Sequence, residues 1–550
     1  MRGLIDKIIF GLCVLMIFPA CKGRDIDSEQ NGQTKNIQKS SVEDESDSVN
    51  WSSVTPEILW QHADELYQTE GPKMALSFIQ RGMSHGVVSD DDADQVRAVF
   101  LYELGRFDEA FMALARYIIT VNRPDLLELR AKILGKMGRY EDARRDFETL
   151  IDPQSTTVTP EILYSAALLY DDIGDWDKNR ETVRRLDNEF PDSPLPIRYK
   201  LRDALASDDY RRIASAKEDY DNQASEGEPD PVSVFAYAYN QALQGNFSSA
   251  IDSTRKAIID NGCQPDLITL LVKLDIESAD YKSFEKDLRS CFEDLDSIAW
   301  LDSKPENWPP PTDHPVEVAR LLDLAGAFYL GNGDRVKARA LAERALSLDP
   351  YNFNAKQQLA LVSMNENDFS GAFLALNEAV KIAPPTDARV RIRILQLTSL
   401  APAGTDIPWD IGAIASELEK ICDHREKQFP SNAFFKSARA EVYAARGDFK
   451  NALVTIEKAC ALPGATRDFR LREIYFLIKL GRIEDARGIA EKYVPSGSPY
   501  LLWVFSMMLE SLSKNDEALG RFALEMKDRI DPKGEHDDFF VAPSPDPEEE

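Results

Sequence analysis

A heptapeptide pattern that recurs nine times along this 550-residue chain constrains the fold more than any other feature. Copies such as LGRFDEA ending at Ala110, MGRYEDA ending at Ala143 and RGDFKNA ending at Ala452 share a turn-forming residue, an aromatic residue and a final alanine. Where copies follow one another directly, their ends lie 32 to 36 residues apart. A fixed period of this length indicates a repeat array, in which each unit buries its apolar face against the next.

Each copy of the pattern predicts a tight turn between two antiparallel helices. The glycine, as in Gly105 and Gly138, ends the first helix because it adopts the left-handed conformation at low cost. A small residue about two helical turns earlier lies on the same face and lets the helices approach. These small residues are Ala131, Ala167, Ala238, Gly326, Ala360 and Ala440. Prolines that end the second helices are Pro191, Pro350, Pro384 and Pro430. We therefore expect an all-α fold of stacked hairpins, each in contact only with its neighbours.

The pattern resembles the tetratricopeptide repeat. The best copy runs from Leu321 to Pro350 and reads LLDLAGAFYLGNGDRVKARALAERALSLDP. The resemblance covers residues 55–532 and implies an α-solenoid, a right-handed superhelix whose concave face binds extended peptides or partner helices. It predicts two arrays, residues 51–300 and 316–532. Weaker units are expected at 55–85, 195–225, 265–295 and 385–430.

The N-terminal residues 1–20 read as a targeting segment. A thirteen-residue apolar run from Ile8 to Ala20 is too short to cross a bilayer and fits the core of a secretory signal. It ends in a small residue followed by Cys21, which resembles the lipobox of bacterial lipoproteins and implies lipidation of Cys21. A plain secretory signal and an uncleaved anchor are the alternatives.

Polar stretches flank the predicted arrays. Residues 21–50 are a disordered tether, since they have almost no bulky apolar side chains, and residues 533–550 are an acidic disordered tail or a peptide ligand for a basic partner. Residues 301–315 form an insertion with Trp308, and a second insertion at 400–410 holds Trp409. Each insertion is either a recognition loop or a spacer.

The charge balance and the scattered histidines exclude several functions. The chain has 65 basic and 94 acidic residues, a net charge of −29, which repels phosphate backbones and favours neutral or basic partners. Its five histidines show no metal-ligand spacing, and no catalytic motif occurs. We expect no metal, no cofactor, no small-molecule substrate and no enzyme activity. Adjacent carboxylates such as Asp171 and Asp172 are common simply because acidic residues are abundant.

Aromatic residues on the predicted first helices are the candidates for partner binding, because aromatic side chains bury large areas with few rotatable bonds. A late cluster is the predicted protein-binding patch: Phe434, Tyr475, Tyr500 and Trp503. Other inward-facing candidates are Tyr164, Phe235 and Tyr239. The alternative is that several of these rings pack between neighbouring repeats.

Four cysteines lie in the predicted arrays, namely Cys263, Cys291, Cys422 and Cys460. An exported location permits disulfides, and the pairs Cys263–Cys291 and Cys422–Cys460 fall on neighbouring repeats. Free thiols are the other interpretation, and the sequence favours it.

The function expected from these features is a non-catalytic scaffold of the bacterial envelope, anchored by lipid and binding envelope proteins or peptides in the groove. One alternative is a stable accessory subunit of an envelope enzyme or export complex. A second is a carbohydrate- or peptidoglycan-binding module, because aromatic grooves also stack sugars.

Overall fold

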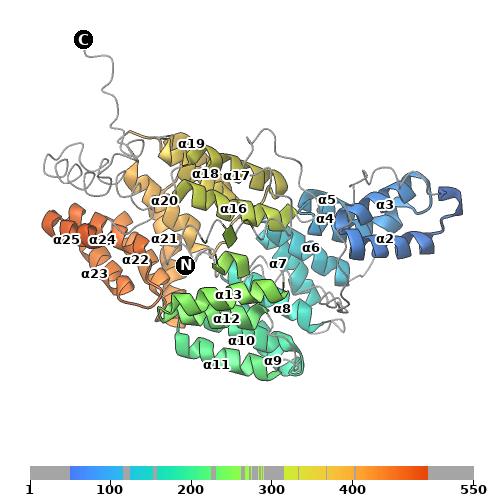
Figure 1. The fold of residues 1–550 in the computed structure, drawn as a ribbon, viewed down its shortest axis with the longest axis horizontal. Helices are drawn as coiled ribbons and strands as arrows, with labels where there is room; N and C mark the ends of the chain where they lie inside the picture. The colour runs from blue at the N-terminus through green and yellow to red at the C-terminus, as the bar shows by residue number, and fades with distance from the viewer. Residues whose placement is uncertain are drawn as a thin grey trace, which may run out of the picture.

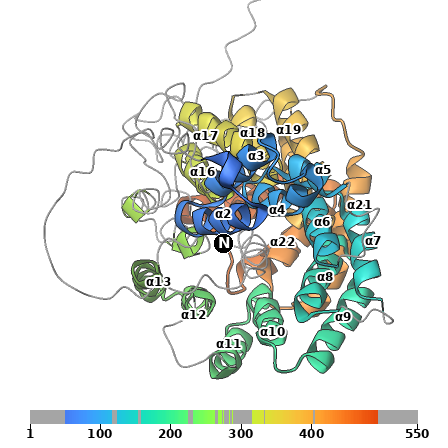
Figure 2. The same ribbon diagram turned by 90° about the vertical axis from the view of Figure 1, so that its right-hand side faces the viewer.

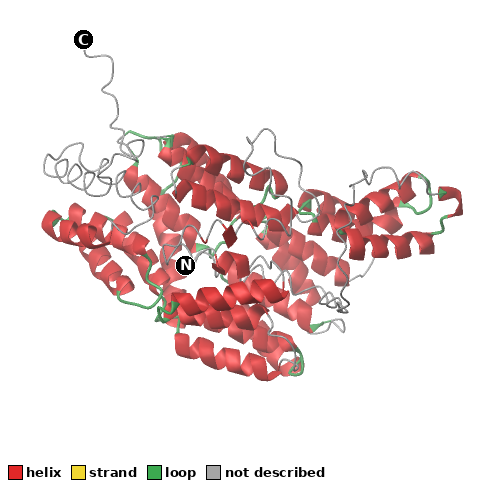
Figure 3. Ribbon diagram, in the orientation of Figure 1, coloured by secondary structure: helices red, strands yellow, loops and turns green. Residues whose placement is uncertain are grey.

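The computed structural model describes residues 50–115, 124–152, 158–223, 231–261, 315–331, 334–366, 368–401 and 404–493, together with short helical pieces between 267 and 289. Every regular element in these residues is a helix (Figure 3). After the short 3-10 helix η3 (Trp51–Ser53), the helices of the first half are α2 (Pro56–Glu70), α3 (Pro72–Ser84), α4 (Asp90–Glu103), α5 (Phe107–Ala115), α6 (Pro124–Lys136), α7 (Tyr140–Leu150), α8 (Pro160–Ile173), α9 (Trp176–Glu189), α10 (Pro194–Ser207), α11 (Tyr210–Gln223), α12 (Pro231–Leu243) and α13 (Phe247–Asn261). Those of the second half are α16 (Pro315–Gly331), α17 (Arg335–Leu348), α18 (Phe353–Asn365), α19 (Phe369–Ile382), α20 (Ala388–Leu400), α21 (Ile411–Gln428), α22 (Ala433–Ala445), α23 (Phe449–Cys460), α24 (Arg467–Lys479) and α25 (Ile483–Tyr493).

The helices pair into consecutive hairpins, from α2–α3 to α24–α25, and within the described stretches α2 to α13 and α16 to α25 each hairpin packs on the next. The predicted all-α array is therefore confirmed, including hairpins in three of the weaker units, at α2–α3, α10–α11 and α20–α21. Seen end on, α6 to α13 follow a curved path (Figure 2). The unit predicted at 265–295 is described only in part. Of the insertion predicted at 301–315, only Pro315 is described, as the first residue of α16.

Turn chemistry follows the sequence pattern at several hairpins. Gly138 and Gly447 both end a first helix with φ near +75°, and in both cases the next residue's amide bonds back to the helix. The aspartates Asp334, Asp368 and Asp448 cap second helices by accepting a hydrogen bond from the backbone amide three residues later. Hairpin formation is thus encoded locally, within each repeat.

The predicted small residues lie where the helices touch. Ala131, Ala167, Ala238, Ala360 and Ala440 are all at most 1% exposed. A Cβ placed on Gly326 would come within 2.4 Å of the Gln358 side-chain amide, so a larger residue there would force that side chain to move. Close helix packing therefore depends on these positions, as the sequence predicts.

The two halves of the array fold back onto each other, contrary to the expectation that each hairpin contacts only its neighbours. In Figure 1 the ends of α16 and α17 lie next to α4, α5 and α6. The loop after α17 contacts α5, and the end of α19 with the loop after it contacts α7 and α8. Hydrogen bonds join residues separated by 243, 242, 254 and 226 positions. These separations equal about seven repeats of about 34 residues, so the chain completes one superhelical turn in about seven hairpins and the next turn packs on it.

Candidate functional site

The turns within first-half hairpins contact the loops between second-half hairpins, and we call this line of contacts the seam. Tyr351, just after α17, donates a hydrogen bond to the Asp108 carboxylate at 2.9 Å, and the Tyr140 hydroxyl donates to the Ile382 carbonyl at 2.8 Å. Further along, Asn432 Nδ2 donates to the Ala206 carbonyl at 2.8 Å. Successive turns therefore meet successive loops in register.

At the seam, backbone of the second half approaches the turn glycines Gly138 and Gly105 closely. Glycine is therefore required there for lack of space as well as for its left-handed turn conformation. A Cβ on Gly138 would lie 2.6 Å from the Lys381 carbonyl oxygen and 2.9 Å from Ile382 Cα. A Cβ on Gly105 would also lack space, because it would lie 2.8 Å from a Val316 methyl carbon and 3.3 Å from the Leu348 carbonyl oxygen. By contrast, a Cβ on Gly447, in the same heptapeptide position, would meet nothing within 4 Å. Gly105 and Gly138 thus serve both the turn and the seam, whereas a Cβ on Gly245 would meet nothing within 4 Å.

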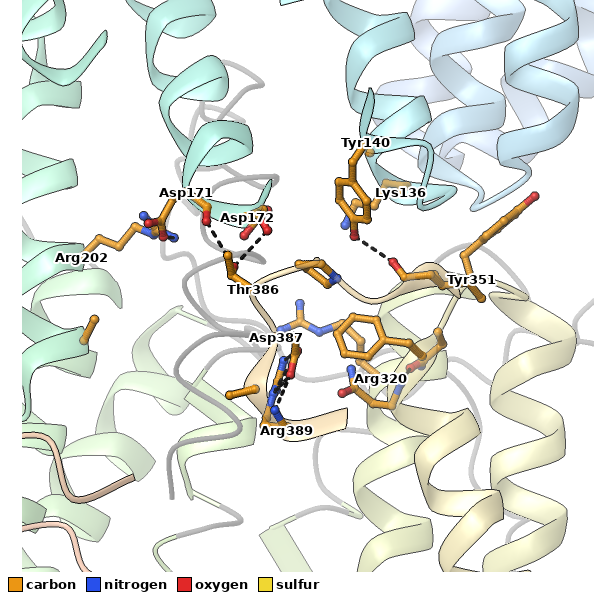
Figure 4. A pocket seen from close by; sticks show the side chains of 18 of the residues that line it. Lys136, Tyr140, Asp171, Asp172, Arg202, Arg320, Tyr351, Thr386, Asp387 and Arg389 are labelled. Carbon is orange, nitrogen blue, oxygen red and sulfur yellow. Dashed lines mark hydrogen bonds and ion pairs between the residues drawn. The ribbon is translucent and has the colours of Figure 1, made fainter. Parts of the chain in front are cut away.

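Thr386 completes the C-terminal end of helix α8. Its backbone amide donates to the Asp172 carbonyl at 3.0 Å, and its hydroxyl lies within hydrogen-bond distance of the Asp171 and Asp172 carbonyls. The last carbonyls of a helix have no partner within the helix, so a donor from another segment stabilises them. In Figure 4 these contacts appear as dashed lines from Thr386 to the end of α8.

Asp171 forms the central ion pair of the seam. The two terminal nitrogens of Arg425 lie 2.9 and 3.0 Å from its two carboxylate oxygens, and Arg202 adds a contact at 3.3 Å. Burial by itself raises the pKa of Asp171, but the two guanidinium groups outweigh burial and hold that pKa below its ordinary value. The paired, ionised carboxylate therefore ties α8 and α10 to α21.

A stacked ring pair extends the same contact. The Trp176 ring lies on the His424 ring with centroids 3.7 Å apart and planes 3° from parallel. Burial, together with neighbouring Arg425, lowers the pKa of His424 to about 4, so the imidazole is neutral near pH 7. The seam thus combines hydrogen bonds, an ion pair and ring stacking.

A cavity of about 220 Å³ lies at the seam, lined by residues of both halves (Figure 4). Tyr140, Tyr351 and Phe353 supply aromatic rings, and Asp172 and Asp387 lie on opposite halves. Burial raises the pKa of Asp172 to about 7, and the nearby carboxylates of Asp171 and Asp387 act in the same direction. Asp387, in contrast, pairs with Arg389, which outweighs burial and lowers the Asp387 pKa.

The predicted groove residue Tyr475 is a core residue, and its assignment to an exposed groove is wrong. It is 2% exposed, its ring centroid is 6.3 Å from that of Phe449, and the Arg472 guanidinium lies 4.4 Å from its centroid. Arg472 is itself held by a bidentate ion pair with Glu441 at 2.6 and 2.7 Å. Helix α24 is buried on several sides, so its periodicity does not separate groove-facing from packing positions.

The other predicted aromatics fall into two groups. Phe434 is half-buried and packs against Phe435, with centroids 5.3 Å apart. Tyr500 and Trp503 lie outside the described residues, as does the predicted lipidation site Cys21. The rings of Tyr164, Phe235 and Tyr239 are at most 2% exposed and pack in the core between hairpins. The described part of the chain holds only Phe434 and Tyr475 of the predicted patch, so the patch as a whole stays a prediction.

Two further predictions concern Trp409 and the cysteines. Trp409 packs edge-on against Phe373 of α19 at 5.3 Å, which attaches the 400–410 segment to the core. Cys422 and Cys460 are free thiols, and burial raises the pKa of each to about 12, which disfavours the reactive thiolate. Cys263 and Cys291 lie outside the described residues.

The described residues contain no group of three side chains suited to hold a metal ion. Within the same part of the chain, none of the helices combines the length and the apolar character needed to cross a bilayer.

One family model agrees with the repeat architecture over part of the chain. A tetratricopeptide repeat model matches residues 129–194, from within α6 to the first residue of α10. No curated protein matches the chain. Among solved structures, the crystal structure of the APC/C hetero-tetramer Cut9-Hcn1 is similar, with 13% identity, coverage of 89% of this chain and 96% of that chain, and a TM-score of 0.39. The family match thus identifies a tetratricopeptide repeat within residues 129–194.

Proposed function

We propose that this protein is a non-catalytic interaction scaffold of the bacterial cell envelope, exported and anchored through a lipidated Cys21. The repeat architecture is the observation that carries the scaffold role, because the hairpins provide extended binding surface. The apolar run that ends at Cys21 supports the anchor. The net charge of −29 favours neutral or basic partners, mainly by steering their approach.

Burial of the aromatic rings weakens the carbohydrate-binding alternative. That alternative depends on rings exposed for stacking, whereas Tyr164, Phe235, Tyr239 and Tyr475 are buried. The scaffold and the accessory subunit both remain consistent with the fold, and they differ in the number and stoichiometry of partners.

Affinity capture from the membrane fraction separates these functions. Tagged full-length chain should return several envelope proteins, and Cys21→Ser should move the chain to the soluble fraction or block its processing. A single partner in a fixed ratio supports the accessory subunit instead. Capture of no protein would refute the scaffold. A Cys21→Ser chain with the same molecular mass and the same membrane partition as wild type would refute the anchor.

A further inference from the structure

Asp172 differs from the other carboxylates at the heart of the seam cavity. Asp171 pairs with Arg425 and Arg202, and Asp387 pairs with Arg389. The Asp172 carboxylate makes neither an ion pair nor a side-chain hydrogen bond within the described part of the chain, where only its main-chain oxygen is engaged, by Thr386. The cavity therefore contains one carboxyl group for which the described residues provide no partner.

A partly buried carboxylate without a partner is unfavourable, because burial removes hydration and nothing replaces it. Asp172 is partly buried at the cavity wall, and burial raises its pKa to about 7. The charged groups that act most strongly on its pKa are Asp171 on its own helix, Arg202 on α10, Arg425 on α21 and Asp387 before α20. Lys136 and Arg320 also line the cavity, and each has an interaction of its own. A cation supplied from outside would restore the favourable ionised state.

The rest of the lining favours a cation over an anion. The guanidinium groups of Arg202, Arg425 and Arg389 are already engaged by carboxylates. Tyr140 lines the same cavity, and aromatic faces attract organic cations. The Phe353 ring already shows such a contact, with the Arg389 guanidinium 5.6 Å from its centroid. A cavity of about 220 Å³ is of the size of one side chain, not of a folded domain.

We propose that the seam cavity receives a lysine or arginine side chain of a partner protein, with the Asp172 carboxylate as its counter-ion. This inference rests on the proposed function, because it names the chemistry by which a scaffold partner is recognised. Bound across residues of both halves, such a side chain would also hold the seam closed.

Calorimetric titration of the full-length chain with acetyl-arginine amide and acetyl-lysine amide tests this proposal, with acetyl-norleucine amide as the uncharged control. Binding of the basic amides should strengthen between pH 6 and 8 as Asp172 ionises, by up to about tenfold per pH unit below its pKa. Asp172→Asn should weaken binding at pH 8 about tenfold or more. Asp177→Asn is the matched control, because it removes an equal charge from a carboxylate that is 90% exposed on α9.

Several outcomes would overturn the proposal. They are absence of binding, equal binding of the norleucine amide, a pH-independent affinity, and an Asp172→Asn protein that binds as wild type. The pH dependence of the wild-type chain keeps the test valid even if the variant misfolds. Partner proteins captured equally by wild type and Asp172→Asn would refute this inference and leave the scaffold standing. Basic amides that bind while no partner protein is captured would refute the scaffold and leave the cavity site standing.

Discussion

Replacing Gly138 by alanine should open the seam, and the same change at Gly447 provides the matched control. Both glycines end a first helix in the same heptapeptide position, with φ of +75° and +76°. An alanine in this left-handed conformation costs roughly 1–2 kcal/mol at either site. Only at Gly138 would the new Cβ also meet backbone atoms, at 2.6 and 2.9 Å.

The extra cost at Gly138 can be estimated from that clash. Neither contact atom belongs to a flexible side chain, so α7 and the loop after α19 must separate. Overpacking of this kind typically costs about 1–3 kcal/mol. Separation would also break the hydrogen bond from Tyr140 to the Ile382 carbonyl, worth about 1 kcal/mol. Gly138→Ala should therefore destabilise the protein by about 2–4 kcal/mol more than Gly447→Ala.

Urea unfolding followed by circular dichroism measures the difference between the variants, and hydrogen exchange locates it. Gly138→Ala should accelerate exchange both around Gly138 and around residues 380–390, although these segments lie more than two hundred residues apart. Gly447→Ala should affect only its own hairpin. Equal destabilisation by the two variants, or loss of protection confined to α6 and α7 in Gly138→Ala, would refute the seam.

Three further predictions follow from burial and charge. Ala345→Asp should destabilise the protein by several kcal/mol, because Ala345 is fully buried in α17. Hydrogen exchange should become faster in its own hairpin and also around Gly105, which lies across the seam. Faster exchange confined to residues 320–385 would contradict this. Tyr475→Ala should lower the unfolding midpoint through loss of about 3–5 kcal/mol, since the ring is core, and an unchanged melt would restore the groove assignment. Because the pKa of Asp172 is raised to about 7, its contribution to stability is fully present below pH 4 and is lost as the pH rises through about 7. In Asp172→Asn the free energy of unfolding should therefore fall less over this pH range, by up to a few kcal/mol. Identical pH profiles of stability for the two proteins would contradict this.

The hairpin array was predictable because its signals are local. Glycine turns, small contact residues and terminating prolines all act within about 34 residues. The weak unit at α10–α11 shows where the pattern fails: Asp208 adopts the left-handed conformation that glycine usually takes, and its carboxylate accepts a hydrogen bond from Tyr239 at 2.6 Å. A hairpin formed in this way has no recognisable heptapeptide.

The seam was not predictable because its partners come from different superhelical turns. Nothing near Asp171 in the sequence indicates Arg425, 254 residues away, and an adjacent pair of aspartates has no meaning in a chain with 94 acidic residues. Likewise, the expectation of contact only between neighbouring hairpins holds for an open solenoid and fails once the turns touch. The candidate site emerges from this closure and not from any motif.

Lysine cross-linking of the wild-type monomer, read out by mass spectrometry, tests the closed superhelix most directly. Lys178 and Lys427 lie two and three residues from Trp176 and His424, whose rings stack with centroids 3.7 Å apart. Lys136 lies two residues from Gly138, which is in close contact with Lys381. A closed superhelix predicts intramolecular cross-links between Lys178 and Lys427 and between Lys136 and Lys381, both abolished in urea. Cross-links restricted to neighbouring hairpins, with neither long-range pair recovered from monomer, would contradict it.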